Sequence, residues 1–115
     1  MTITQLQEGP VILIGYEYRL QLEAEADLFP EGAVFAGQLR STIAATTVLA
    51  VLATLGGSVL RLDERTLEIV LTPAVTSGLA PGGVVLDLVR TDLTPDRHLG
   101  FLLEIPVALP VTRGL

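Results

Sequence analysis

The sequence predicts an all-β protein folded as a single antiparallel β-sandwich, and two alternating segments carry this prediction. In residues 16–26 every second side chain is apolar, and charged or amide side chains fill the positions between. Residues 100–112 repeat this alternation, with apolar side chains at every odd position from 101 to 111. Successive side chains of a strand point to opposite faces, so each segment predicts a strand with one dry and one wet face. On a helix the same residues would leave no coherent apolar face.

The first third of the chain reads as strands separated by turn residues. Residues 2–7 form a short leading strand, which Glu8-Gly9-Pro10 closes. The apolar run 11–15 continues into the alternating strand. Residues 27–32 form a loop, because Pro30 restricts Phe29 and Gly32 permits a turn. Residues 33–41 then form a strand with Ala33, Phe35, Gly37 and Leu39 on one face.

The remaining elements follow the same logic. Residues 43–55 are apolar on both parities, and we expect a strand covered on both faces. Residues 74–83 form a loop or a single helical turn. Pro106 and Pro110 predict that the last strand lies at a sheet edge or that its prolines face away from the neighbouring strand. The other expected strands are 58–63, 66–72, 84–91 and 100–112, with 92–97 as a hairpin connection. About seven or eight strands in one domain, residues 1–115, indicate an immunoglobulin-like or jelly-roll-like sandwich.

Composition excludes several classes of function and favours self-association. The chain has no cysteine, one histidine and a net charge of −6, and its seven basic residues are scattered. We therefore expect no nucleic-acid partner. Residues 41–60 are uncharged, but they contain several Ser and Thr and a Gly-Gly pair, so we expect no membrane span. Half of the 115 residues are hydrophobic, more than a small sandwich can bury, and the excess predicts a partner subunit.

No group of residues predicts a catalytic, cofactor or metal site. His98 has no nucleophile beside it and reads as a surface hairpin residue. Asp87, Asp92 and Asp96 could meet near one loop, but they lack the spacing of a calcium loop. We expect these aspartates to cap turns. The sequence thus predicts a protein that is not an enzyme and that needs no cofactor.

The order of these features resembles small β-sandwich proteins of tailed bacteriophages. The resemblance is to the immunoglobulin-like N-terminal domain of baseplate upper-protein type and to related tail or head accessory proteins. It rests on the alternating strand and the segments that follow it: Asp27-Leu28-Phe29, Phe35-Ala36-Gly37-Gln38-Leu39-Arg40, 66–71, 76–82, 84–90 and Val111-Thr112-Arg113. The chain departs from the family pattern at Leu28-Phe29-Pro30, where the family has a Leu-Thr-Gly turn. The resemblance implies a role in assembly and supplies no functional residues.

Together these observations predict a structural protein of the virion, assembled in the host cytoplasm. It would belong to the tail or baseplate, or decorate the capsid, with other virion proteins and copies of itself as partners. Its contacts would use the apolar strand positions left over from the core, namely Val11, Leu13, Val34, Val48, Leu52 and Val70. The alternative is a carbohydrate- or receptor-binding sandwich, although two Tyr, three Phe and no Trp provide few rings for a sugar.

Overall fold

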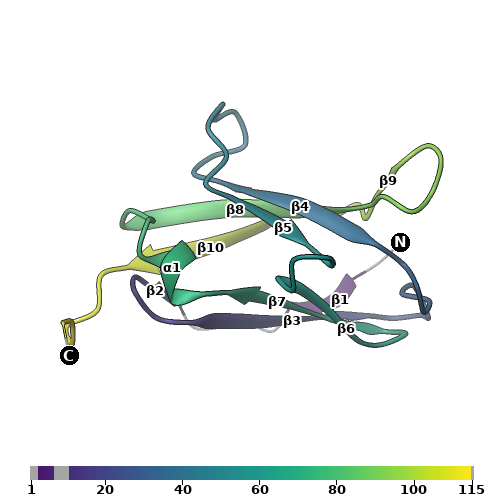
Figure 1. The fold of residues 1–115 in the computed structure, drawn as a ribbon, viewed down its shortest axis with the longest axis horizontal. Coiled ribbons are helices and arrows are strands. Elements are labelled where there is room, and N and C mark those ends of the chain that lie inside the picture. The colour runs from purple at the N-terminus through teal and green to yellow at the C-terminus, as the bar shows by residue number, and fades with distance from the viewer. Residues whose placement is uncertain (1–2, 7–10, 115) are drawn as a thin grey trace.

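The computed structural model describes residues 3–6 and 11–114 and, for 3–6, the backbone alone. The described part holds ten strands and one short helix (Figure 1). In chain order these are β1 (Ile3–Leu6), β2 (Ile12–Leu13), β3 (Tyr18–Ala24), β4 (Phe35–Arg40), β5 (Ala50–Ala53), β6 (Val59–Asp63), β7 (Thr66–Leu71), α1 (Pro73–Thr76), β8 (Gly82–Arg90), β9 (Arg97–His98) and β10 (Leu103–Ala108). The prediction of an all-β chain is confirmed. The turn predicted at residues 8–10 lies outside the described residues, as do the ends of the strand predicted at 2–7.

The strands form two sheets, seen in Figure 1 as two layers. Sheet A has the order β1-β3-β7-β6, and its neighbouring strands are antiparallel. Sheet B has the order β2-β10-β8-β4-β5, with β9 paired to β8. Only the β2–β10 pair among these is parallel. The helix α1 lies between β7 and β8, where the chain passes from sheet A to sheet B (Figure 1).

The alternating segment at residues 16–26 forms β3 and builds the core as predicted. Its side chains at positions 18, 20, 22 and 24 are buried, whereas Arg19 and Glu23 are exposed. The inward side chains of both sheets join one apolar cluster, in which the rings of Phe29 and Phe35 pack edge to face with centroids 5.7 Å apart. The core therefore lies between the two layers and leaves the outer face of each sheet to solvent.

The number of strands exceeds the predicted seven or eight partly because the chain changes sheets at Gly15. The segment predicted as an apolar run leading into one long strand is divided there into β2 and β3. Gly15 has a φ of 90°, a left-handed backbone conformation that suits glycine. As a result β2 pairs with β10 in sheet B, while β3 pairs with β1 and β7 in sheet A.

The strand predicted at residues 43–55 is wrong for most of its length. Only Ala50–Ala53 forms a strand, and residues 41–49 form a loop that stands above sheet B (Figure 1). The Arg40 guanidinium donates a hydrogen bond of 2.6 Å to the Ala45 carbonyl oxygen and so fastens this loop to β4. A strand apolar on both faces needs cover on both, and the rest of this chain does not cover the outer side of sheet B.

The last predicted strand is shorter than expected, and the expectation about its prolines is met in part. β10 lies between β8 and β2 rather than at the sheet edge. However, β2 pairs only with Val107 and Ala108, so in the described residues the side of β10 facing β2 is unpaired as far as Pro106. Pro106, which has no N–H to donate, is therefore tolerated there. Pro110 lies beyond the strand.

Candidate interaction surface

The residues predicted from the sequence to contact a partner do not gather on one surface. Val11 and Leu13 lie at β2, on one edge of sheet B. Val34 precedes β4 and Val48 precedes β5, toward the opposite edge. Leu13 is 42% exposed, whereas the three valines are half-buried. A single partner that covers both edges would have to span the whole sheet.

Two of the predicted contact residues are buried within the chain and offer no surface. Leu52 is 1% exposed and belongs to the core cluster. On β5 Leu52 faces inward and Val51 faces solvent, whereas Leu52 was predicted to contact a partner. Val70 is 8% exposed on the outer side of sheet A, where its cross-strand partner is Arg19. The prediction is therefore corrected for Leu52 and Val70.

The outer face of sheet B, called the B face below, carries three of the exposed large apolar side chains. Ile43 and Val51 are each 68% exposed, and Leu102 is 47% exposed. Burial alternates along β4, β8 and β10. The even-numbered positions of β4 and β10 and the odd-numbered positions of β8 from 85 onward face outward on this side of sheet B. The B face consists of Gln38, Arg40, Ile43, Val51, Val85, Asp87, Leu102, Glu104 and Pro106.

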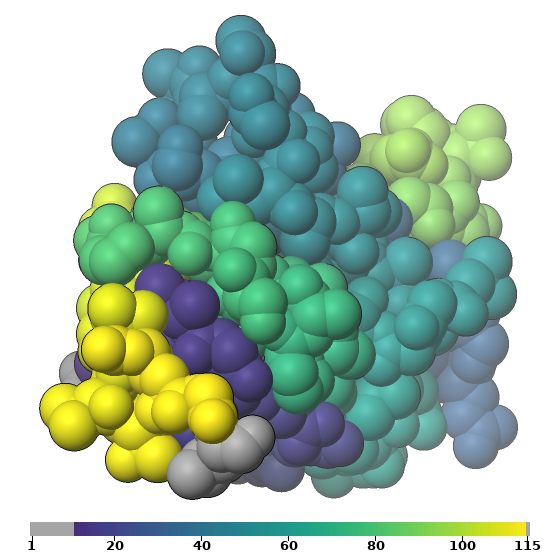
Figure 2. Space-filling model, turned by 60° about the vertical axis from the view of Figure 1, so that its left-hand side comes forward, coloured from purple at the N-terminus to yellow at the C-terminus, as the bar shows by residue number. Residues whose placement is uncertain are grey.

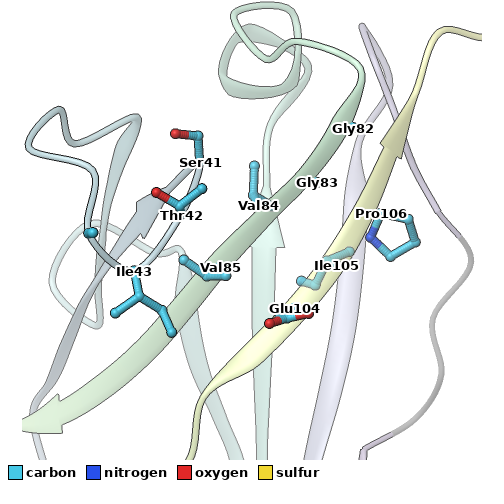
Figure 3. A pocket seen from close by; sticks show the side chains of 11 residues that line it. Ser41, Thr42, Ile43, Gly82, Gly83, Val84, Val85, Glu104, Ile105 and Pro106 are labelled. Atoms are coloured by element: carbon cyan, nitrogen blue, oxygen red, sulfur yellow. The ribbon is translucent and has the colours of Figure 1, made fainter.

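The B face is hollowed between the 41–49 loop and β10. A cavity of about 720 Å³ lies there, with β8 as its floor. Figure 3 shows Ile43 reaching from the loop toward Val85, while Glu104 and Pro106 line the opposite side on β10. A smaller cavity of about 120 Å³ adjoins it and shares Ile43 and Val85 in its lining. The two together form an open, largely aliphatic depression.

A second apolar group lies beside the C-terminal segment. Leu13 and Tyr16 line a hollow with residues 109–112, and Val111 is 96% exposed. The Tyr16 hydroxyl donates a hydrogen bond of 2.9 Å to the Thr112 carbonyl oxygen. Figure 2 shows this segment in yellow against the purple N-terminal part, at the opposite end from the projecting 41–49 loop. The two apolar groups are therefore separate.

His98 on β9 has both ring nitrogens engaged. His98 Nδ1 accepts a hydrogen bond of 2.8 Å from the Gly100 N–H, so Nε2 carries the proton of the neutral ring. Nε2 lies 2.8 Å from Asp87 Oδ2 and donates to it. A general base needs a free ring nitrogen aimed at a substrate or nucleophile. This arrangement fits the predicted hairpin role of His98.

Asp92 holds the loop before β4 rather than standing free for a cation. Its Oδ2 accepts a hydrogen bond of 2.7 Å from an Arg90 terminal nitrogen, and its Oδ1 accepts from Arg90 Nε and from the Val34 N–H. These bonds favour the charged carboxylate, the Arg90 bond most of all, and they hold the pKa of Asp92 well below its ordinary value. The sequence predicts that Asp92 caps a turn, whereas the backbone amide that it binds belongs to Val34, far away in the chain.

The lowered pKa of Asp92 predicts a loss of stability in acid. The carboxylate stabilises the fold fully above its unfolded pKa of about 3.9, and this contribution is lost as the pH falls through the folded value. We expect the free energies of unfolding of wild type and Asp92→Asn to differ by a constant amount above about pH 5 and to converge below about pH 4. Urea unfolding at a series of pH values tests this, with Asp96→Asn, an exposed neighbour, as the control. A gap that stays constant to pH 2 would contradict it.

The sequence analysis missed the residues that shape the B face. Ile43 owes its position to the 41–49 loop, most of which was predicted as a strand, and the Arg40 side chain on β4 is held by its hydrogen bond to Ala45 of that loop. Glu104 and Val85 are distant in sequence and meet only through the pairing of β10 with β8. The one available signal was the high overall content of hydrophobic residues, which indicated surplus apolar surface without indicating its location.

Searches for a metal site, a membrane helix and a related protein gave three results. In residues 3–6 and 11–114, no three His, Asp or Glu side chains lie close enough together to hold a metal ion. Over the same part of the chain, no helix has the length and apolar character needed to cross a membrane. Comparison with known proteins found no matching family model, no matching curated protein and no matching solved structure.

Proposed function

We propose that this chain is a non-enzymatic structural protein of a phage particle, which assembles by docking the B face on a partner in the tail, baseplate or capsid. The exposed aliphatic depression on the B face is the observation that carries the docking role. The sequence resemblance to small virion proteins supports the particle assignment. As a component of the particle, the protein would act within the virion.

The order of the strands supports an immunoglobulin-like sandwich as the finer description of the fold. Sheet A follows the A-B-E-D order of such domains, with β1, β3, β7 and β6 in these places. In sheet B the strands β10, β8, β4 and β5 follow the order G-F-C-C′, the last of which is added in variable-type domains. On this description the B face is the G-F-C-C′ face.

The apolar content of the B face is what an assembly surface requires. Isolated apolar side chains on a surface are ordinary, but Ile43, Val85 and Leu102 of the B face lie around one depression and share its lining. Ile43, Val85 and Leu102 approach this depression from the loop, β8 and the segment before β10. A sugar-binding alternative has less support, because no aromatic side chain lines either cavity.

Sedimentation of the purified protein, alone and with phage tail or head particles, tests the proposed docking. Leu102→Asp places a charge on the B face, and we expect it to weaken association at least about tenfold. Leu62→Asp is a matched control, because Leu62 is also 47% exposed but lies on β6 in sheet A. We expect this variant to associate like wild type.

Two results would overturn the proposed function. One is a protein that stays monomeric up to millimolar concentration and does not sediment with particles. The other is equal weakening by Leu102→Asp and Leu62→Asp, which would show that the B face has no special part in association.

A further inference from the structure

Two opposite charges flank one apolar residue in a single row across the B face. Arg40 on β4 is the cross-strand partner of Val85 on β8, and Glu104 on β10 is the partner of Val85 on its other side. All three side chains line the depressions of the outer face. The row therefore reads positive, apolar, negative from β4 to β10.

These two charges do not meet within one chain. Two strand spacings separate their backbones by about 10 Å. The Arg40 guanidinium donates instead to the Ala45 carbonyl oxygen at 2.6 Å and to Gln38 Oε1 at 2.7 Å. Among the ion pairs of the described residues, none includes Arg40 or Glu104. Each charge thus remains free to pair with a second molecule.

We propose that the B face binds a second copy of this chain about a two-fold axis that runs parallel to β8 over Val85. This inference rests on the proposed docking role of the B face and names its partner. Such an axis stacks β4 of one copy on β10 of the other, so Arg40 of each copy faces Glu104 of the other and Val85 packs on Val85. An axis across the strands would instead place Arg40 opposite Arg40. Stacked sheets lie about 10 Å apart, a gap that an arginine and a glutamate together can span.

The 41–49 loop suits this pairing, because it projects from the same side as the charged row. Figure 1 shows the loop rising above sheet B, and Figure 3 shows the hollow between the loop and β10. The two-fold axis places the loop of each copy above β10 of the other. Ile43 of one copy can then cover Pro106 of the other and close the hollow.

The size of the face predicts a weak dimer. Four strands of about six residues project roughly 400 Å², about half of what each partner buries in a standard interface, so the loops must supply the rest. Asp87, two residues along β8 from Val85, faces its own copy across the axis, and its carboxylate is drawn toward β9 by the hydrogen bond from His98. We therefore expect dissociation constants in the micromolar range or above, which many copies in one particle would reinforce.

Charge reversal tests this geometry by sedimentation equilibrium at low salt. Glu104→Arg sets two arginines opposite each other at both ends of the row, and we expect the dissociation constant to rise about tenfold or more. Arg40→Glu should weaken the dimer similarly, and the double variant should restore it because the pairs re-form with reversed sign. Glu23→Arg makes the same change on the exposed face of sheet A and should leave the dimer unchanged.

The outcomes separate this inference from the proposed function. Since Arg40 also fastens the 41–49 loop, a failed rescue counts against the geometry only if circular dichroism shows that the double variant is folded. If the double variant is unfolded, the comparison of the dissociation constants of Glu104→Arg and Glu23→Arg tests the two-fold pairing instead, because Glu104 is an exposed side chain whose replacement should not disturb folding. Equal dissociation constants for these two variants overturn the two-fold pairing. Docking of the B face would still stand if Leu102→Asp weakened binding to particles.

Discussion

Replacing Gly37 with alanine is expected to destabilise the protein by about 3 kcal/mol, which for a domain of this size lowers the melting temperature by about 10 °C or more. Gly37 is a buried residue of β4, and a Cβ built on it overlaps the backbone carbonyl oxygen of Asp87 and lies 2.8 Å from Leu88 Cδ2. β4 pairs with β8 on one side and β5 on the other, so it cannot move away from β8 without disturbing β5. Thermal unfolding followed by circular dichroism measures the loss.

The control for this prediction is Gly56→Ala. At Gly56 an added Cβ meets only the Ala53 carbonyl oxygen, at an ordinary distance of 3.9 Å, so we expect a change within about 0.5 kcal/mol. Both substitutions remove the same backbone freedom from the unfolded chain, so their difference isolates the steric conflict. Equal melting temperatures for the two variants would show that β4 and β8 can separate without cost.

The predictable parts of the fold are those in which a local sequence pattern determines which face of a strand each side chain occupies. The alternation of Leu20 and Leu22 with Arg19 and Gln21 assigns each side chain to a face, and the burial of β3 follows it. Pairing between strands is different, because it depends on residues far apart in the chain. The sequence around Gly15 does not indicate that β2 and β3 belong to different sheets, because a left-handed glycine is compatible with many turns.

The candidate surface was less predictable than the core for the same reason. The excess of aliphatic residues was evident from composition, but its location depends on which segments the core can accommodate. Residues 41–49 have strand-like composition but form a loop, and the pairing of β5 with β4 places Leu52 inside and Val51 outside. The row of Arg40, Val85 and Glu104 joins three strands that only the register brings together.

Replacing Thr76 with valine is expected to cost about 2 kcal/mol, although the side chain keeps its shape and stays buried. Thr76 is the buried polar residue of the described chain, with no exposed surface. Its hydroxyl donates a hydrogen bond of 2.9 Å to the Tyr16 carbonyl oxygen and accepts one of 3.1 Å from the Gly15 N–H. Valine leaves both backbone groups without this partner. Urea unfolding measures the loss, and hydrogen exchange at the Gly15 amide should become faster.

Thr76→Ser separates the hydrogen bonds from packing. Serine keeps the hydroxyl and loses one methyl group, a change of about 0.8 kcal/mol. We therefore expect valine to be the more destabilising substitution, and the reverse order would show that the methyl contact matters more than the two bonds. The position of Thr76 in the fold explains the expected size of the loss of stability in Thr76→Val. Gly15 lies where the chain passes from β2 in sheet B to β3 in sheet A, and Thr76 lies where it passes from β7 in sheet A to β8 in sheet B, so one hydroxyl joins two of the places at which the chain changes sheets.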